Sequence, residues 1–221
     1  MQNKGIIFDL DGVIVDTAKY HFLAWKNLAE SLEIHFNKKQ NEQLKGVSRI
    51  ESLKKILTWG KKRISEKHFN ELLHQKNEEY LGFVEKMDAS EILPGVLKRL
   101  KMLKNEGYPI ALGSASKNAK TILQRVDLLS YFDVIVDGNE VSKAKPDPEV
   151  FVKAAKLLGV EPHQAIVFED ALAGIEAANA ARMTSVGIGE KAILNKADFV
   201  FENFTQINDQ KFEEILNFSK A

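Results

Sequence analysis

The chain has 221 residues, with 31 Lys or Arg and 31 Asp or Glu, so its formal net charge is zero. This balance argues against a nucleic-acid-binding protein that relies on a basic surface, and the absence of cysteine excludes disulfides, thiol catalysis and cysteine-ligated zinc. No stretch approaches the ~18 apolar residues of a membrane span, and no secretory signal is visible. We therefore expect a cytoplasmic protein that binds neither membranes nor nucleic acid. We also expect a monomer, although these bulk properties do not reveal the oligomeric state.

Short apolar runs rich in β-branched residues predict six buried strands. Near-continuous apolar runs are typical of parallel strands that are covered on both faces. Helical patterns lie between most of them, so the sequence predicts an α/β fold with a doubly wound, mostly parallel sheet. The predicted strands cover residues 5–8, 109–113, 134–137, 165–168, 184–187 and 199–201, and the predicted helices between them cover residues 95–106, 117–129, 147–158 and 171–181.

The segment between the first two strands breaks this alternation, because it contains no convincing strand. Its pattern predicts several helices, for instance at residues 21–32, 48–57 and 65–86. Long insertions of this kind are usually functional, and many act as lids. The sequence therefore predicts an α/β core made of residues 1–16 and 90–221, with an inserted helical cap made of residues 17–89.

Polar side chains follow four of the predicted strands, at the point where each strand ends. In open α/β sheets, ligands bind outside the carboxyl ends of the strands, so we expect these side chains to meet in one site. The residues concerned are Asp9 and Asp11 after the first strand, Ser114, Ala115, Ser116 and Lys117 after the second, Asp137 and Lys145 after the third, and Glu169 and Asp170 after the fourth.

The residue types at these strand ends predict phosphoryl transfer. Asp9 comes first after its strand and is the best candidate for a nucleophile that accepts a phosphoryl group. Asp11 lies on the loop, where it is free to act as general acid and base. Glu169 and Asp170 add carboxylate oxygens, and carboxylates this close repel one another unless a cation such as Mg²⁺ relieves them. Lys145 offers a positive charge, and phosphoryl transfer depends chiefly on positioning and neutralised charge.

Each motif also has a structural interpretation. The Asp-x-Asp-Gly run taken alone could be a turn or part of a calcium loop. Ser114 and Ser116 offer hydroxyls near a helix N-terminus, which is a ready phosphate site, and Ser116 is also a candidate N-cap for a helix that starts at Lys117. The Glu-Asp pair could cap the helix that follows it, and Lys145 could belong to a simple turn.

Four segments in order along the chain resemble the motifs of the haloacid dehalogenase superfamily of phosphotransferases. The resemblance covers essentially the whole chain and implies a Rossmann-like core. It implies that Asp9 is the nucleophile, Asp11 the acid and base, Lys145 the charge stabiliser and Asp170 a magnesium ligand. The backbone carbonyl of Asp11 would join the metal, with Glu169 nearby. The matching segments are residues 8–13, 114–116, 145–146 and 169–170.

Within this superfamily, the cap segment is similar to that of the β-phosphoglucomutase family. The resemblance implies an isomerase that interconverts β-D-glucose 1-phosphate and glucose 6-phosphate, through a phosphorylated Asp9 and β-glucose 1,6-bisphosphate. It assigns Thr17, His21 and Ser114 to the catalytic group, with His21 and Lys76 in a hinge relay that positions Asp11. The residues that it assigns to substrate binding are Trp25, Lys45, Gly46, Val47, Ser48, Arg49, Ser52, Lys76, Ala115, Ser116, Lys117 and Asn118.

Such an isomerase must hold a sugar that carries two phosphates, one at Asp9 and one at a separate basic site. Arg49 can bind a phosphate through two N–H groups, and Ser116, Lys117 and Asn118 can complete that site from the core when the cap closes. Closure would exclude water, which would otherwise hydrolyse the phosphorylated aspartate.

Other interpretations of the cap residues and of the activity stay open. On charge alone, Lys45 and Arg49 would be solvated loop residues, and His21 would be an exposed histidine. A sugar-phosphate phosphatase with the same fold is the main alternative activity. A catalytically silent interaction protein is a third, although the complete set of strand-end residues argues against it.

Overall fold

The predicted strands form one parallel sheet in a computed structural model, which describes residues 4–45 and 47–220. The strand order is β3-β2-β1-β4-β5-β6, with β1 next to β2 and β4, and every pairing is parallel. The predicted α/β fold with a doubly wound parallel sheet is therefore confirmed. The strands are β1 (Gly5–Phe8), β2 (Ile110–Gly113), β3 (Val134–Val136), β4 (Ala165–Glu169), β5 (Thr184–Ile188) and β6 (Phe199–Phe201).

Most of the predicted helices form within a few residues of their expected bounds. Helices α2 and α9 and the short 3-10 turns were not predicted. The helices are α1 (Ala18–Ser31), α2 (Lys38–Glu42), α3 (Arg49–Trp59), α4 (Glu66–Val84), α5 (Val96–Asn105), α6 (Ala119–Arg125), α7 (Glu149–Leu158), α8 (Leu172–Ala180) and α9 (Asp209–Asn217), and the 3-10 turns are η1 (Ala89–Glu91), η2 (Leu129–Tyr131), η3 (Pro162–Gln164) and η4 (Phe204–Gln206).

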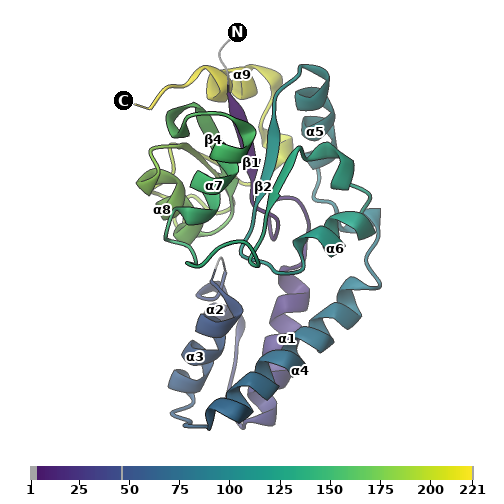
Figure 1. Cartoon of the computed structure of the whole chain (residues 1–221), viewed down its shortest axis with the longest axis vertical. Helices are drawn as coiled ribbons and strands as arrows, with labels where there is room; N and C mark the ends of the chain where they lie inside the picture. The colour runs from purple at the N-terminus through teal and green to yellow at the C-terminus, as the bar shows by residue number, and fades with distance from the viewer. Residues whose placement is uncertain (1–3, 46, 221) are drawn as a thin grey trace.

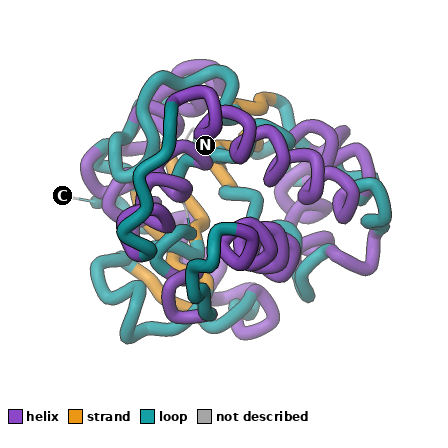
Figure 2. The backbone as a smooth tube through the Cα atoms, turned by 90° about the horizontal axis from the view of Figure 1, so that it is seen from below, coloured by secondary structure: helices purple, strands orange, loops and turns teal. Residues whose placement is uncertain are grey.

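Helices cover both faces of the sheet. Successive side chains of a strand point to opposite faces, so each buried strand packs against helices on both sides. Ile7 of β1 packs with Phe151 of α7 and Ala177 of α8 on one face. Its neighbour Phe8 packs on the other face, in a cluster that also contains Leu100 of α5 and side chains of α6 and α9. In Figure 1, α7 and α8 lie on one side of the strands and α5 and α6 on the other, and in Figure 2 helices and loops surround the strands.

Helices α1 to α4 lie beneath the carboxyl ends of the strands in Figure 1, and α1, α3 and α4 share an apolar cluster of their own. The cluster joins Trp25 and Leu28 of α1 to Leu53 and Ile56 of α3 and to Leu72 of α4. We propose that residues 17–89 form a cap on a core made of residues 1–16 and 90–221, and the separate cluster supports this division.

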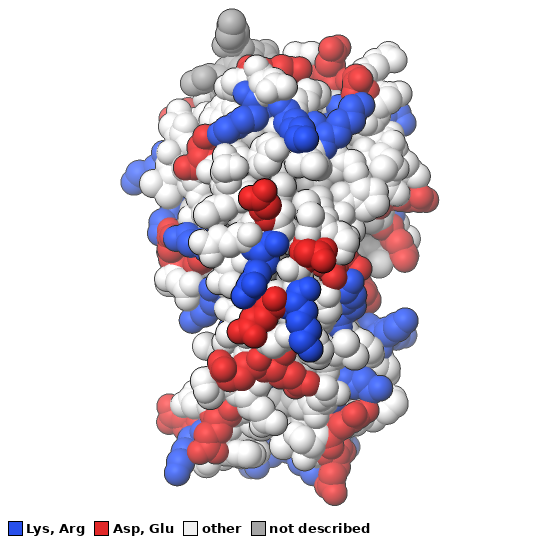
Figure 3. Space-filling view, turned by 90° about the vertical axis from the view of Figure 1, so that its right-hand side faces the viewer, with Lys and Arg blue, Asp and Glu red and all other residues white. Residues whose placement is uncertain are grey.

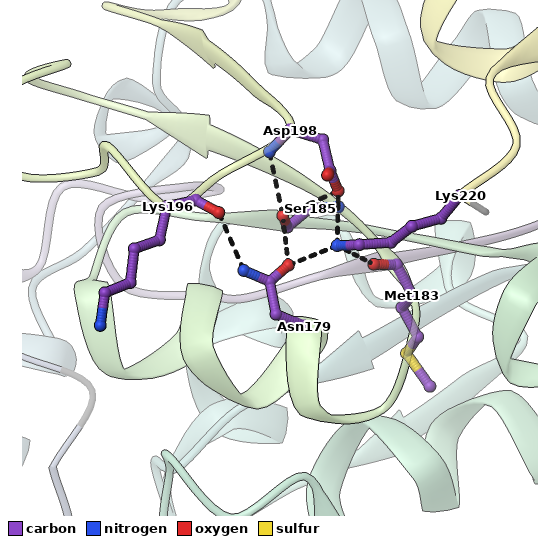
Figure 4. Close-up of polar contacts among 6 residues, drawn as sticks. All are labelled: Asn179, Met183, Ser185, Lys196, Asp198 and Lys220. Atoms are coloured by element: carbon purple, nitrogen blue, oxygen red, sulfur yellow. Dashed lines mark hydrogen bonds and ion pairs between the residues drawn. The ribbon is translucent and has the colours of Figure 1, made fainter.

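The end of the chain is tied to the edge of the sheet that lies away from the cap. Lys220 Nζ donates to Asn179 Oδ1 at 2.6 Å and to Asp198 Oδ2 at 2.8 Å. The same Asp198 oxygen accepts from the backbone N–H of Ser185 at 2.8 Å and from its hydroxyl at 3.0 Å, as Figure 4 shows. These contacts join α8, the start of β5, the residue before β6 and the C-terminal segment.

Charges of both signs are mixed on the surface. On the face shown in Figure 3, Lys and Arg side chains lie beside Asp and Glu side chains around the middle of the molecule. Within the described part of the chain, no helix combines the length and apolar character that crossing a membrane requires.

Candidate active site

Asp9, Lys145 and Glu169 form a buried charged group at the ends of β1 and β4. Lys145 Nζ lies 2.6 Å from Asp9 Oδ1 and 2.6 Å from Glu169 Oε1. The second oxygen of Glu169 accepts the backbone N–H of Ala171 at 2.7 Å, so both of its oxygens are engaged. Burial acts to lower the pKa of Lys145, but the two carboxylates outweigh it and raise that pKa above its ordinary value. The ammonium therefore stays charged beside Asp9.

The ionised form of Asp9 is stabilised less well than the charged form of Lys145. Burial raises the pKa of Asp9 to about 7, although the charge of Lys145 acts in the opposite direction. Burial and the neighbouring carboxylate of Glu169 also raise the pKa of Asp170 well above its ordinary value. These two carboxylates carry more negative charge than the nearby cations neutralise.

A divalent metal ion fits this arrangement. Carboxylate oxygens of Asp9, Glu169 and Asp170 lie within 4.8 Å of one another. Because Lys145 and Ala171 already engage both oxygens of Glu169, Asp9 and Asp170 are the better candidates for ligands. Hard oxygen ligands suit a hard cation, and a double positive charge would relieve the repulsion that raises the two pKa values. The predicted metal ligand from Asp11 is its backbone carbonyl, and its carboxylate makes contacts elsewhere.

The carboxylate of Asp11 faces the first turn of α1. Thr17 Oγ1 donates to Asp11 Oδ1, and His21 Nε2 lies 3.6 Å from the same oxygen. His21 Nδ1 lies 2.9 Å from Lys76 Nζ, whose ammonium is 4.5 Å from the ring centroid of Tyr80. Because Lys76 donates to Nδ1, a neutral His21 carries its proton on Nε2, toward Asp11. The predicted relay of His21, Lys76 and Asp11 is therefore a connected set of side chains.

Burial and the charges of neighbouring side chains shift the pKa values of Asp11, His21 and Lys76. Burial acts to raise the pKa of Asp11, but His21, Thr17 and the charge of Lys76 outweigh it, so the pKa is lowered. Burial and the charge of Lys76 lower the pKa of His21. Burial, helped by the charge of Arg49, lowers the pKa of Lys76 to about 7. At neutral pH the geometry therefore favours an ionised Asp11 beside a neutral imidazole.

Gly12 allows the loop after β1 to pass under Asp170. Its φ is +81°, a conformation that residues with a side chain rarely adopt. A Cβ at this position would also collide with the carboxylate of Asp170. Gly12 is therefore required both by the backbone conformation and by the approach of a candidate metal ligand.

A cavity of about 280 Å³ lies against these groups, between the core and helices α1, α3 and α4. Its walls contain most of the predicted site residues from both parts of the chain. These are Asp9, Asp11, His21, Trp25, Lys45, Val47, Ser48, Arg49, Ser52, Lys76, Ser114, Ala115, Ser116, Lys117, Asn118 and Asp170. Thr17, Lys145 and Glu169 are buried and are not part of the wall, although Thr17 donates to Asp11 and Lys145 to Asp9. Gly46 lies outside the described residues.

Two contacts join the cap segment to the core across the cavity. Lys45 Nζ lies 3.5 Å from Asp170 Oδ2, and Asn118 Nδ2 donates to Asn77 Oδ1 at 3.1 Å. Asn77 also lines the cavity, as do Tyr80 and the loop of residues 141–144, which are not among the predicted site residues. The sequence does not mark that loop as part of the site, because an irregular loop has no periodic pattern of apolar and polar residues.

Two details at the strand ends differ from the predictions. Ser116 is not the N-cap of a helix starting at Lys117, because α6 begins at Ala119. Its hydroxyl instead accepts the N–H of Asn118 at 3.2 Å, two residues on. Asp137 turns into its own loop, where Oδ1 accepts the N–H of Asn139 at 2.8 Å.

The fold and the order of these groups define the class of protein. The model of the haloacid dehalogenase-like hydrolase family matches residues 3–182, and the chain belongs to this family. It is 43% identical to the β-phosphoglucomutase of Bacillus subtilis strain 168 over 213 residues, which are 96% of this chain and 94% of that protein. The predicted resemblance is thus confirmed.

Two further relatives show the range of activities around this chain. A crystal structure of β-phosphoglucomutase from Clostridium difficile superposes with a TM-score of 0.93 at 41% identity and covers 97% of each chain. A phosphorylated carbohydrates phosphatase of Thermotoga maritima is 32% identical and covers 98% of each chain. The fold alone therefore does not separate transfer to a sugar from transfer to water.

Proposed function

We propose that this protein interconverts β-D-glucose 1-phosphate and glucose 6-phosphate. One observation carries the proposal: a single cavity is lined by Asp9 and Asp11 from the core and by Arg49 from the cap segment. A bisphosphorylated sugar needs a reaction centre and a second cationic site on opposite sides of one enclosed space. The 43% identity to a β-phosphoglucomutase over nearly the whole chain supports the same conclusion.

The proposed reaction begins with a phosphorylated Asp9. The 6-hydroxyl of β-glucose 1-phosphate attacks the phosphorus, the bond between phosphorus and the Asp9 oxygen breaks, and Asp11 takes the hydroxyl proton. The resulting β-glucose 1,6-bisphosphate then binds in the opposite orientation. Asp9 attacks the phosphorus of the 1-phosphate, and Asp11 returns its proton to the departing sugar oxygen. The products are glucose 6-phosphate and phosphorylated Asp9, so atoms and charge balance.

The residues around the two aspartates suit these roles. Lys145, 2.6 Å from Asp9, neutralises charge on the nucleophile and on the transferred group. The lowered pKa of Asp11 keeps it ionised, so it is ready to accept the proton of the attacking hydroxyl. Asp9 and Asp170 would hold a divalent cation, for which we propose Mg²⁺, and such a cation would supply further neutralisation of the phosphoryl oxygens.

A sugar-phosphate phosphatase is the second candidate, and the 32% identity to the Thermotoga maritima phosphatase favours it. Both activities use a phosphorylated Asp9 and differ only in whether a sugar hydroxyl or water accepts the phosphoryl group. The substrates in either case are small sugar phosphates.

The test is a coupled assay that measures glucose 6-phosphate and free phosphate together, with β- or α-glucose 1-phosphate as substrate. We expect glucose 6-phosphate from the β anomer to exceed free phosphate. Asp9→Asn should lose at least about 10³-fold in turnover, because an amide is a far weaker nucleophile. Phosphate release as the dominant reaction would establish the phosphatase instead, and full turnover by Asp9→Asn would contradict both.

A further inference from the structure

The loop between β3 and α7 leads directly to Lys145 and lines the cavity. Gly138 and residues 141–144 are part of the cavity wall, and the next residue is the buried lysine that binds Asp9. The loop has no strand or helix of its own, so the position of Lys145 depends on what holds the loop. Polar backbone groups of such a loop need partners to stay in one conformation.

Glu149, the first residue of α7, holds the second half of this loop. Its carboxylate accepts the N–H of Ser142 at 3.0 and 3.1 Å, the hydroxyl of Ser142 at 2.9 Å and the N–H of Lys143 at 2.7 Å. A carboxylate that accepts several donors makes strong, directional contacts. One side chain therefore fixes two consecutive residues of the cavity wall.

Lys153, one helical turn further along α7, holds the first half of the loop. Its Nζ donates to the backbone carbonyl of Glu140 at 2.9 Å and lies 3.2 Å from the carboxylate of the same residue. Residues four apart on a helix share a face, so Glu149 and Lys153 both face the loop. The first accepts from loop N–H groups and the second donates to a loop carbonyl.

A further contact between α7 and the loop lies at Lys145 itself. Phe151, fully buried between α7 and the sheet, has its ring centroid 4.6 Å from Lys145 Nζ. Because Phe151 packs in the core cluster of β1 and β2, the helix is a rigid support. Contacts with α7 therefore hold the loop in its first half, in its second half and at Lys145.

We propose that Glu149 and Lys153 are positioning residues for phosphoryl transfer, which act by fixing residues 138–145 and, through them, the ammonium of Lys145 against Asp9. The inference rests on the proposed function only in that Asp9 accepts a phosphoryl group. Neither side chain touches the transferred group. Displacing a catalytic group by about 1 Å can cost up to ~10²-fold in rate, so small changes in this loop should matter.

The experiment compares Glu149→Ala, Glu149→Gln and Lys153→Met with the full-length wild-type protein. Lys156→Met is the matched control, because Lys156 is exposed on the same helix. Glucose 6-phosphate and free phosphate are both measured for every variant. If the wild type only releases phosphate, the proposed function fails, but the effect of each variant on phosphate release still tests the positioning role.

Glu149→Ala should lower kcat about 10-fold, with KM changed less than about 3-fold, because the substrate still binds while Lys145 is misaligned. Glu149→Gln, which retains one acceptor oxygen, should fall between Glu149→Ala and wild type, and Lys153→Met should show a smaller decrease in kcat. Hydrogen exchange should become faster at the amides of Ser142 and Lys143 in Glu149→Ala. Lys156→Met should match wild type in all measurements.

A purely structural role predicts something different. A lower melting temperature with kcat within twofold of wild type, measured well below that temperature, would overturn the proposal. Unchanged exchange at the Ser142 and Lys143 amides in Glu149→Ala would overturn it as well. If Glu149→Ala does not fold, Glu149→Gln and Lys153→Met decide the question by the same two criteria.

Discussion

Gly12 is the residue at which backbone conformation and metal binding meet. Its φ of +81° and its approach to Asp170 both require the absence of a side chain. Gly12→Ala should therefore displace the Asp170 carboxylate and weaken Mg²⁺ binding at least about 10-fold, as loss of ligand orientation does elsewhere. Calorimetric titration of the purified variant with Mg²⁺, followed by turnover at saturating Mg²⁺, measures both effects.

Gly107→Ala is the matched control for that experiment. Gly107 has a similar φ of +77°, but a Cβ there would meet no atom of the described residues within 4 Å. The control should cost about 1 kcal/mol of stability, because its backbone conformation becomes strained, and should leave Mg²⁺ affinity unchanged. Equal loss of Mg²⁺ affinity in the two variants would attribute the effect to strain and not to Asp170.

Lys76 makes the stability of the protein depend on pH. Its pKa falls to about 7 in the folded chain from an ordinary value of 10.5, because it is buried and lies near Arg49. Between these pH values the unfolded chain binds a proton that the folded chain does not, so the free energy of unfolding rises with pH. Relative to Lys76→Met, the wild type should gain up to about 2 kcal/mol between pH 7.5 and 9.

Urea unfolding of both proteins at the two pH values measures this difference. The exposed Lys67, on the same helix, provides a control, and Lys67→Met should follow the wild type. The titration of His21 does not affect this comparison. Its pKa is lowered from 6.5, so His21 titrates below the pH range that is measured. A constant difference between wild type and Lys76→Met would show that Lys76 is not desolvated in the folded protein.

Much of the candidate site could be predicted from single residues. Asp9, Ser114 and Asp170 lie at strand ends, and a short apolar strand followed by a polar residue is visible in sequence. The contacts that orient them are not visible, since Thr17 donates to Asp11 only because α1 begins where it does. The roles of these residues stay predictions until they are tested.

At the scale of elements, the sequence predicts long periodic segments better than short ones. The sequence does not predict α9, because only a few apolar residues mark it, although Asn208 caps it by accepting the N–H of Lys211 at 2.8 Å. The sequence pattern predicts that α6 starts at Lys117, two residues before its observed start at Ala119. Ser114 and Ser116 each accept the N–H of the residue two positions on, and such turns compete with a helix.

The carboxylate of Asp198 connects β5 to the residue before β6 and to the C-terminal segment. Asp198 accepts from the N–H and hydroxyl of Ser185 and from Lys220 (Figure 4). Asp198→Ala removes these acceptors and should lower the free energy of unfolding by about 1–3 kcal/mol, whereas Asp198→Asn should cost less. Turnover should not change, because Asp198 precedes β6 and the site lies at the other ends of the strands. Urea unfolding and the coupled assay check both, and a loss of turnover in folded Asp198→Ala would contradict this separation.

At the scale of the whole molecule, the sequence predicts a core and a cap but not how they meet. The apolar cluster of α1, α3 and α4 follows from helical periodicity, and the faces of the sheet follow from strand periodicity. The contacts across the cavity, Lys45 with Asp170 and Asn77 with Asn118, join residues far apart in the chain. No local pattern in the sequence encodes them.

The hydrogen bond between Asn77 and Asn118 links the cap segment to the core at 3.1 Å, and its loss should favour an open cavity. A hydrogen bond contributes about 1 kcal/mol, so Asn77→Ala should shift the balance between closed and open states about 5-fold. Water then reaches phosphorylated Asp9 more often, and the ratio of free phosphate to glucose 6-phosphate should rise by a similar factor. The coupled assay measures this ratio directly, with Asn70→Ala, an exposed position on the same helix, as the control. An unchanged ratio with a lower total rate would mean that Asn77 binds substrate and does not control access of water.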